Sequence, residues 1–115
     1  MKLPSEALLL RIFIGESDKT HGKALSEVIV EKARKRGMAG ATILRGILGF
    51  GANSRIHTSK VLRLSEDLPV VVEIVDKQEN IEAFLPELDE IIDEGLVTLE
   101  KIRVITYRHS AKQKK

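Results

Sequence analysis

The segment that most constrains the fold is Leu68-Pro-Val-Val-Val-Glu-Ile-Val75, in which β-branched side chains predominate. Such side chains are stiff about χ1 and favour the pleated surface of a strand over a helix. Proline cannot donate a backbone hydrogen bond and is tolerated at the start of a strand, so Pro69 should lie there. We therefore expect a central strand over residues 68–75.

Hydrophobic periodicity predicts the remaining elements. Apolar residues that alternate favour strands, and apolar residues at spacings of three and four favour helices. The expected strands are residues 7–14, 41–49 and 96–107, with a short extra strand at 61–64, and a first helix is expected over residues 23–36. A second helix precedes Gly95. The order strand, helix, strand, strand, helix, strand predicts an α+β, ferredoxin-like βαββαβ fold with both helices on one face of an antiparallel sheet.

The first helix has candidate residues for both of its ends. Ser17, Asp18 and Thr20 are side chains that can accept a hydrogen bond from the first turn. Gly37 suits the left-handed conformation that follows a helix C-terminus. We therefore expect a polar loop over residues 15–22 that leads directly into this helix.

The second helix combines cap signals with a proline. Asp76 and Glu79 have the spacing of a capping box, and Asn80 is a rival N-cap. Pro86 interrupts the apolar stripe, so a kink or a restart is expected there. Gly95 is expected to close the helix.

The sheet face without helices is predicted to be apolar enough to require a cover. Arg11 and Glu73 fall on the two central strands of this face, so we expect a cross-strand ion pair. The apolar residues predicted on this face are Leu9, Phe13, Val71, Val75 and Ile105. Self-association is the simplest way to cover them.

Length and charge suggest one domain with a tail. The 115 residues suffice for one core, expected over residues 1–107, and residues 108–115 form a basic tail. Residues 1–107 carry 15 basic and 17 acidic side chains, so the basic balance belongs to the tail and does not indicate a nucleic-acid partner. The chain has no cysteine and no transmembrane-length apolar stretch, so we expect a cytoplasmic protein that is not inserted in a membrane.

The topology brings three connections to one end of the sheet. Residues 15–22, 50–60 and 93–96 should be neighbours there. The glycines at the start of the long connection allow two interpretations: bulges and turns, or backbone amides that approach a phosphate. The candidate ligand- or partner-binding residues are Arg45, Gly46, Gly49, Gly51, Arg55, His57, Thr58 and Lys60.

Two other kinds of site are compatible with the sequence. Asp18, His21 and His57 could meet at the loop end as a metal site, which would suit a divalent-metal-binding trimer similar to the cation-tolerance proteins. An acylphosphatase-like enzyme ranks third, because residues 15–22 contain no arginine to hold a phosphate. No side-chain pair shows a nucleophile and base relationship, so no catalytic residue is assigned.

Several blocks of the sequence resemble a bacterial and archaeal family of unknown function with a PII-like fold. The blocks are Gly40-Ala-Thr-Ile-Leu-Arg-Gly-Ile-Leu-Gly-Phe-Gly51, Ile56-His-Thr58, Leu64-Ser-Glu-Asp-Leu-Pro-Val-Val-Val-Glu-Ile-Val-Asp76 and Glu94-Gly-Leu-Val-Thr98. A more distant similarity to the PII nitrogen-regulatory signalling proteins rests on the Gly-Phe-Gly51 exit, His57-Thr58 and the strand at Pro69.

The resemblance implies a non-enzymatic signalling homotrimer. In PII proteins a small ligand binds in clefts between subunits, and the long hairpin loop contacts a partner such as a membrane transporter or an enzyme. Here that loop corresponds to residues 50–60, and a nucleotide or another anion is the implied ligand. Asp93 and Glu94 replace a basic, glycine-rich loop, and because carboxylates repel a polyphosphate, ATP binding in the PII manner is disfavoured. Residues 52–60 also lack a tyrosine that could be modified.

Overall fold

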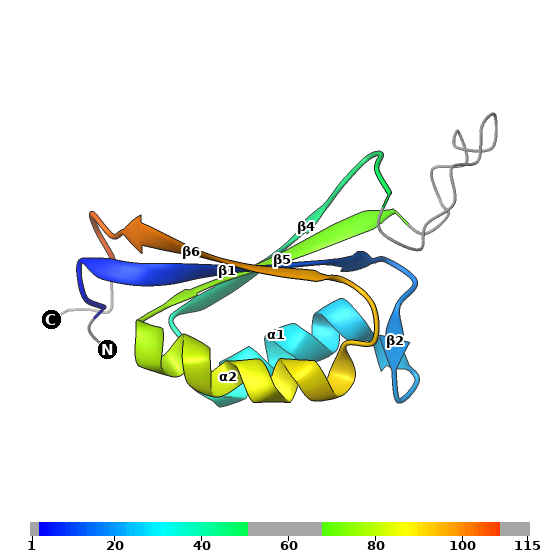
Figure 1. Ribbon diagram of the computed structural model, residues 1–115, viewed down its shortest axis with the longest axis horizontal. Helices are drawn as coiled ribbons and strands as arrows, with labels where there is room; N and C mark the ends of the chain where they lie inside the picture. Colours follow the sequence, from blue (N-terminus) through cyan, green and yellow to red (C-terminus); the bar gives the residue numbers. More distant parts are fainter. Residues whose placement is uncertain (1–2, 51–67, 109–115) are drawn as a thin grey trace, which may run out of the picture.

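A four-stranded antiparallel sheet with two helices on one face organises the chain in a computed structural model, which describes residues 3–50 and 68–108 (Figure 1). The strand order is β4-β5-β1-β6, the order of a ferredoxin-like fold, so the predicted fold class is confirmed. The main elements are β1 (Glu6–Gly15), α1 (Leu25–Lys35), β4 (Gly40–Arg45), β5 (Pro69–Asp76), α2 (Gln78–Ile91) and β6 (Leu96–Arg103). A separate small hairpin is formed by β2 (Lys19–Thr20) and β3 (Lys23–Ala24).

The core lies between the helices and the two central strands. Alternate residues of β1 and β5 point toward the helices, and the register places Leu10 opposite Ile74 and Ile12 opposite Val72. The helices contribute Ile29, Ile81 and Phe84, and like the strand residues these are fully buried. Pro69 begins β5, as predicted from its missing donor. Each central strand therefore gives one face to the core.

The segment before α1 differs from the predicted loop. It contains the β2–β3 hairpin, so α1 begins at Leu25, two residues later than expected. The N-cap is Ala24, which makes no side-chain cap, so the predicted capping roles of Ser17, Asp18 and Thr20 are wrong. Instead the Leu25 N–H donates to the Asp18 carbonyl over 2.9 Å, and this backbone bond replaces a side-chain cap. Gly37 has a φ of 72°, as expected after the helix.

The second helix also begins and ends differently from the prediction. Its N-cap is Lys77 without a side-chain bond, so the capping box of Asp76 and Glu79 is not formed. The helix does not restart at Pro86 but continues to Ile91. Pro86 is exposed, and so is the residue four positions before it, so water can hydrate the carbonyl that loses its partner.

Gly95 serves the turn after α2 and does not cap the helix, whose C-cap is Ile92. Its φ is 152°, and an added Cβ would lie 2.8 Å from the carbonyl oxygen of Phe13. A side chain at this position would therefore collide with the backbone of β1. Glycine allows the chain to enter β6 close against that strand.

The last strand is shorter than predicted. β6 ends at Arg103 because Glu6, its partner in the ladder, is the first residue of β1. Ile105 was expected on the helix-free face, but it lies beyond the strand with 82% of its surface exposed. The chain then passes from β6 to the opposite edge of the sheet, where the Tyr107 hydroxyl donates to the Ala39 carbonyl beside the start of β4 over 2.9 Å.

The strand after α1 is also shorter than predicted. β4 ends at Arg45 and not at residue 49, and the short strand expected at residues 61–64 lies outside the described residues. No helix in the described part of the chain is long and apolar enough to cross a membrane.

Candidate functional site

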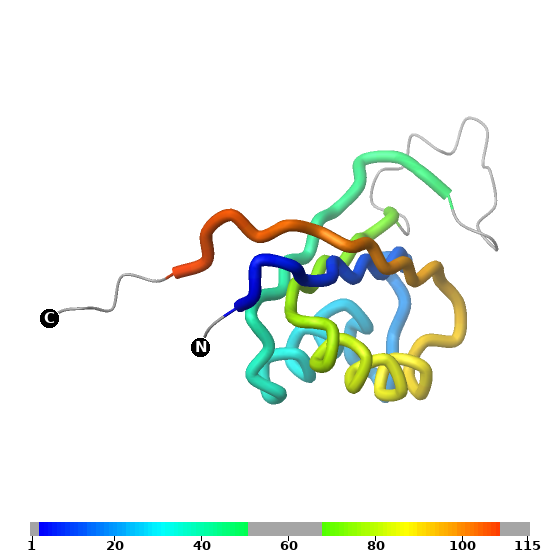
Figure 2. Tube along the Cα trace, turned by 60° about the vertical axis from the view of Figure 1, so that its left-hand side comes forward, coloured from blue at the N-terminus to red at the C-terminus, as the bar shows by residue number. Residues whose placement is uncertain are grey.

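The end of the sheet where β1 and β4 finish and β5 begins gathers the predicted connections. The Glu16 N–H donates to the Leu68 carbonyl over 2.8 Å, and the Gly46 N–H donates to the Pro69 carbonyl over 2.7 Å. We call this region the loop end. Both ends of the described chain lie at the opposite end of the sheet (Figure 2).

The acidic turn after α2 also reaches the loop end. Asp93 and Glu94 line a small cavity of about 190 Å³ together with Asp18 and Lys19. The predicted meeting of residues 15–22 with 93–96 is therefore confirmed. Three carboxylates around one lysine make this corner unfavourable for a polyphosphate.

Arg45 is the one candidate cation of the predicted site within the described residues. It ends β4 and forms an ion pair with Glu16 at the loop end. Its side chain is mostly exposed, so the pair contributes little to stability. An incoming anion can therefore compete with Glu16 for this guanidinium at low cost.

Gly46 and Gly49 pack against Pro69. A Cβ added at Gly46 would lie 2.8 Å from the Pro69 ring, and one at Gly49 would lie 3.0 Å from it. The Gly46 N–H is already bonded to the Pro69 carbonyl and is not available to a phosphate. These two positions thus have a packing reason for glycine, which favours the turn interpretation there. The other candidates, Gly51, Arg55, His57, Thr58 and Lys60, lie outside the described residues.

The candidate metal residues are not brought together in the part of the chain that the structure describes. One carboxylate oxygen of Asp18 accepts the Gly15 N–H over 2.9 Å and so completes a turn. His21 lies at the tip of the β2–β3 hairpin, and His57 lies outside the described residues. Among residues 3–50 and 68–108 no group of three histidine, aspartate or glutamate side chains could hold a metal ion.

The helix-free face carries an apolar row that crosses all four strands. The ladder places Leu44 beside Val71, Val71 beside Phe13, and Phe13 beside Leu96. Leu44, Phe13 and Leu96 are 47%, 37% and 57% exposed. We call these four residues the apolar row. It lies next to the loop end and is a large exposed apolar surface for a small chain.

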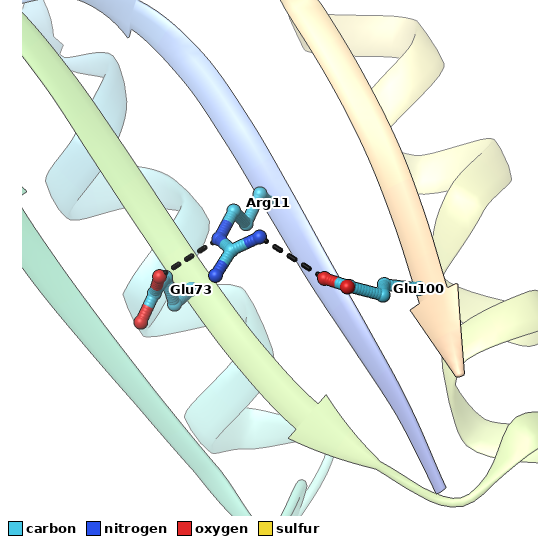
Figure 3. Close-up of polar contacts among 3 residues, drawn as sticks. All are labelled: Arg11, Glu73 and Glu100. Atoms are coloured by element: carbon cyan, nitrogen blue, oxygen red, sulfur yellow. Dashed lines mark hydrogen bonds and ion pairs between the residues drawn. The ribbon is translucent and has the colours of Figure 1, made fainter. Parts of the chain in front are cut away.

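An ion-pair triad lies one step further from the loop end (Figure 3). The Arg11 Nε donates to Glu73 over 2.9 Å, which confirms the predicted pair, and a second guanidinium nitrogen donates to Glu100 over 3.1 Å. The hydrogen bond that Arg11 donates to Glu73 raises the pKa of Arg11 above its already high usual range, and Glu100 adds to this effect, so the guanidinium stays charged. Sequence reasoning missed Glu100, because it lies diagonal to Arg11 and only the register of β6 reveals this.

The strand order and the helix-free face define a ferredoxin-like fold, and solved structures of PII-like proteins share this fold. The chain is similar to a putative PII-like signaling protein from Thermus thermophilus, with a TM-score of 0.61, 19% identity, and 91% and 94% of the two chains covered. It is also similar to CPII from Thiomonas intermedia bound to ADP and bicarbonate, with a TM-score of 0.55, 20% identity, and 86% and 88% covered. At this identity the similarity shows the fold.

The sequence itself identifies the family. Residues 7–104 match the DUF190 family, described as an uncharacterized ACR, and the chain belongs to it. A UPF0166 protein of Aquifex aeolicus is 43% identical over 97 residues, which are 84% of this chain and 91% of that protein. A UPF0166 protein of Methanocaldococcus jannaschii is 36% identical over 100 residues, which are 86% and 92% of the two chains. The resemblance to a PII-like family of unknown function is thereby confirmed.

Proposed function

We propose that this protein is a non-enzymatic, cytoplasmic regulator of the PII-like type that works as a homotrimer. It binds a small ligand, a nucleotide or another anion, between subunits at the loop end. Through residues 50–60 it then contacts a partner such as a membrane transporter or an enzyme. The observation that carries the proposal is the apolar row beside the loop end.

The apolar row supports self-association because its side chains have the character of a core and no cover within the described chain. Burying Phe13 and Leu96 against another subunit removes apolar surface from water. The triad beside them is already paired, so an approaching subunit would meet few unsatisfied polar groups. Assembly on this face would also bring loop ends from different subunits together.

The ligand proposal uses the charge pattern at the loop end. The candidates remain Arg45, Gly46, Gly49, Gly51, Arg55, His57, Thr58 and Lys60. The CPII structure holds ADP and bicarbonate, which supports testing both nucleotides and small anions. The carboxylates of Asp93 and Glu94 disfavour a polyphosphate in the PII manner, so a small anion held by Arg45, outside this acidic corner, is the better fit to the loop end.

Assembly is tested by the mass in solution. Light scattering should give a trimer for the natural chain and a monomer for the double variant Leu44→Glu, Leu96→Glu. Val97→Glu is the matched control, since Val97 is also exposed and lies next to Leu96 but on the opposite face of β6. A monomeric natural protein at about 100 µM would refute the proposed trimer, because stable oligomers of this size dissociate well below that concentration.

Ligand binding is tested with ATP, ADP, AMP, bicarbonate and phosphate by thermal shift. A ligand at about one hundred times its dissociation constant should stabilise the trimer by about 2.7 kcal/mol. Arg45→Gln and Arg55→Gln should weaken the effect, and Lys101→Gln, at the other end of the sheet, should not. If no compound of the panel raises the melting temperature, the proposed ligand class is wrong.

A further inference from the structure

A groove on the helical side of the molecule lies apart from the loop-end site. It runs along α1 and is closed by the end of α2 and by the β2–β3 hairpin, which stands beside both helices (Figure 1). Its volume is about 410 Å³, within the range of small-molecule sites. The lining residues are Thr20, His21, Lys23, Val28, Glu31, Lys32, Lys35, Glu90 and Ile91.

The groove has an excess of cations with free hydrogen-bond donors. Lys23 and Lys35 form no ion pair with a carboxylate of the described residues. Lys32 is 3.9 Å from Glu87, which is the longest of the ion pairs found among the described residues and leaves donors unused. Three lysines against two glutamates leave the lining with a net positive charge, which favours an anionic ligand.

The hairpin is shaped so that a histidine stands at the mouth of the groove. His21 and Gly22 form a two-residue turn with φ angles of 51° and 80°, the pattern of a type I′ turn. Asparagine and aspartate are usual at the first of these positions, and histidine is likewise enriched at positive φ. Turn chemistry is therefore compatible with His21, and it is the place of this side chain in the groove lining that relates it to a ligand.

The two carboxylates of the groove indicate which kind of anionic ligand would fit it. Glu31 and Glu90 also lack ion pairs within the described part of the chain. A bare anion would leave both of them facing it, whereas a ligand with hydroxyl groups can donate to them. Val28 and Ile91 provide an apolar wall between the charged groups.

We propose that this groove binds a small phosphomonoester that carries free hydroxyl groups. Its phosphate is held by Lys23, Lys32, Lys35 and His21, and its hydroxyls donate to Glu31 and Glu90. The site is separate from the loop end and does not depend on the proposed trimer ligand. It uses residues of a single chain, so a monomeric variant should keep it.

The test is calorimetric titration of the full chain with glycerol 3-phosphate, inorganic phosphate and glycerol. Glycerol 3-phosphate should bind more tightly than phosphate, and glycerol alone should not bind. Lys35→Gln should weaken the binding of glycerol 3-phosphate by about tenfold, which is the loss expected for one charge-assisted hydrogen bond. Glu31→Gln should reduce the preference for glycerol 3-phosphate over phosphate.

Two controls make the outcome decisive. His21→Asn keeps the turn preference but removes the imidazole ring, so it should weaken the binding of glycerol 3-phosphate. Lys101→Gln removes a lysine far from the groove and should change nothing. Absence of binding, or binding lost in Arg45→Gln but kept in Lys35→Gln, would overturn the proposal, and the second result would assign the ligand to the loop end.

Discussion

The two faces of the sheet are built from the same strands, yet the two helices cover only one of them (Figure 1). On the helix-covered face, Leu10 and Ile74 are fully buried opposite each other. On the other face, Phe13 and Leu96 are also paired across strands but remain 37% and 57% exposed. Both faces have the apolar character of a core, and what differs is the cover.

The polar residues of β5 show the same contrast. Asp76 points to the helical side, is fully buried, and accepts hydrogen bonds from the backbone of Ala39 and Lys77 and from Asn80. Glu73 points to the other side and is partly exposed, held by Arg11. Because side chains alternate along a strand, one face of β5 can pack in the core while the other face is available for the proposed assembly.

The largest expected effect comes from truncating a buried side chain that packs against the helix-covered face of the sheet. Phe84→Ala should lower the free energy of unfolding by about 3–5 kcal/mol, because it leaves a cavity in a fully buried site. Phe13→Ala should cost the isolated chain less than about 1.5 kcal/mol, since much of that ring is already in water. Urea denaturation at several protein concentrations measures both values. Equal losses at low concentration would show that the two faces are not different.

A middle-sized effect is expected at Asp76. Asp76→Ala leaves buried backbone donors without acceptors and should cost about 3 kcal/mol. Asp76→Asn keeps one acceptor oxygen and should cost about half as much. Urea denaturation of the two variants compares them. A cost of less than about 0.5 kcal/mol for the alanine variant would mean that water replaces the carboxylate.

The smallest effect on the isolated chain is expected at the triad. Arg11→Met or Glu73→Gln should change the urea denaturation midpoint of the monomer only slightly, because both side chains are partly exposed. Either change should weaken the proposed assembly, where the pair would be sealed from water. Sedimentation measures the assembly, and urea denaturation measures the stability of the monomer. The double variant Arg11→Glu, Glu73→Arg keeps the pair but places the new carboxylate on β1 beside Glu100, so it should recover only part of the assembly.

The triad also gives a pH expectation. The pKa of Arg11 is raised in the folded chain, so its stabilising contribution is present below the ordinary arginine pKa and is lost only at still higher pH. Arg11 therefore contributes equally at about pH 6 and about pH 9. If the effect of Arg11→Met on the urea denaturation midpoint changed between these two pH values, the guanidinium would not stay charged over this range.

The sequence predicted the arrangement of the sheet better than its connections. Arg11 and Glu73 could be paired because strand order and side-chain alternation are both readable from apolar periodicity. The contact between Arg11 and Glu100 could not be predicted, because it depends on the register of β6. The β2–β3 hairpin was missed because strands of two residues are too short to show any period.

The candidate site was predictable in position but less so in chemistry. The convergence of residues 15–22 and 93–96 follows from topology alone. The role of Gly46 and Gly49 does not follow from topology. A glycine that contacts a phosphate and a glycine that packs against a proline ring look alike in a sequence. Their contact with Pro69 involves a residue far along the chain, which local patterns do not report.

The contact between Tyr107 and Ala39 has a practical consequence for these experiments. The chain has one tyrosine and no tryptophan, so its intrinsic fluorescence comes almost entirely from Tyr107. That ring lies at the margin of the fold, where its hydroxyl holds the segment after β6 against the start of β4. A fluorescence-detected transition would therefore report the release of this margin, and loss of helical circular dichroism is the appropriate signal for the core.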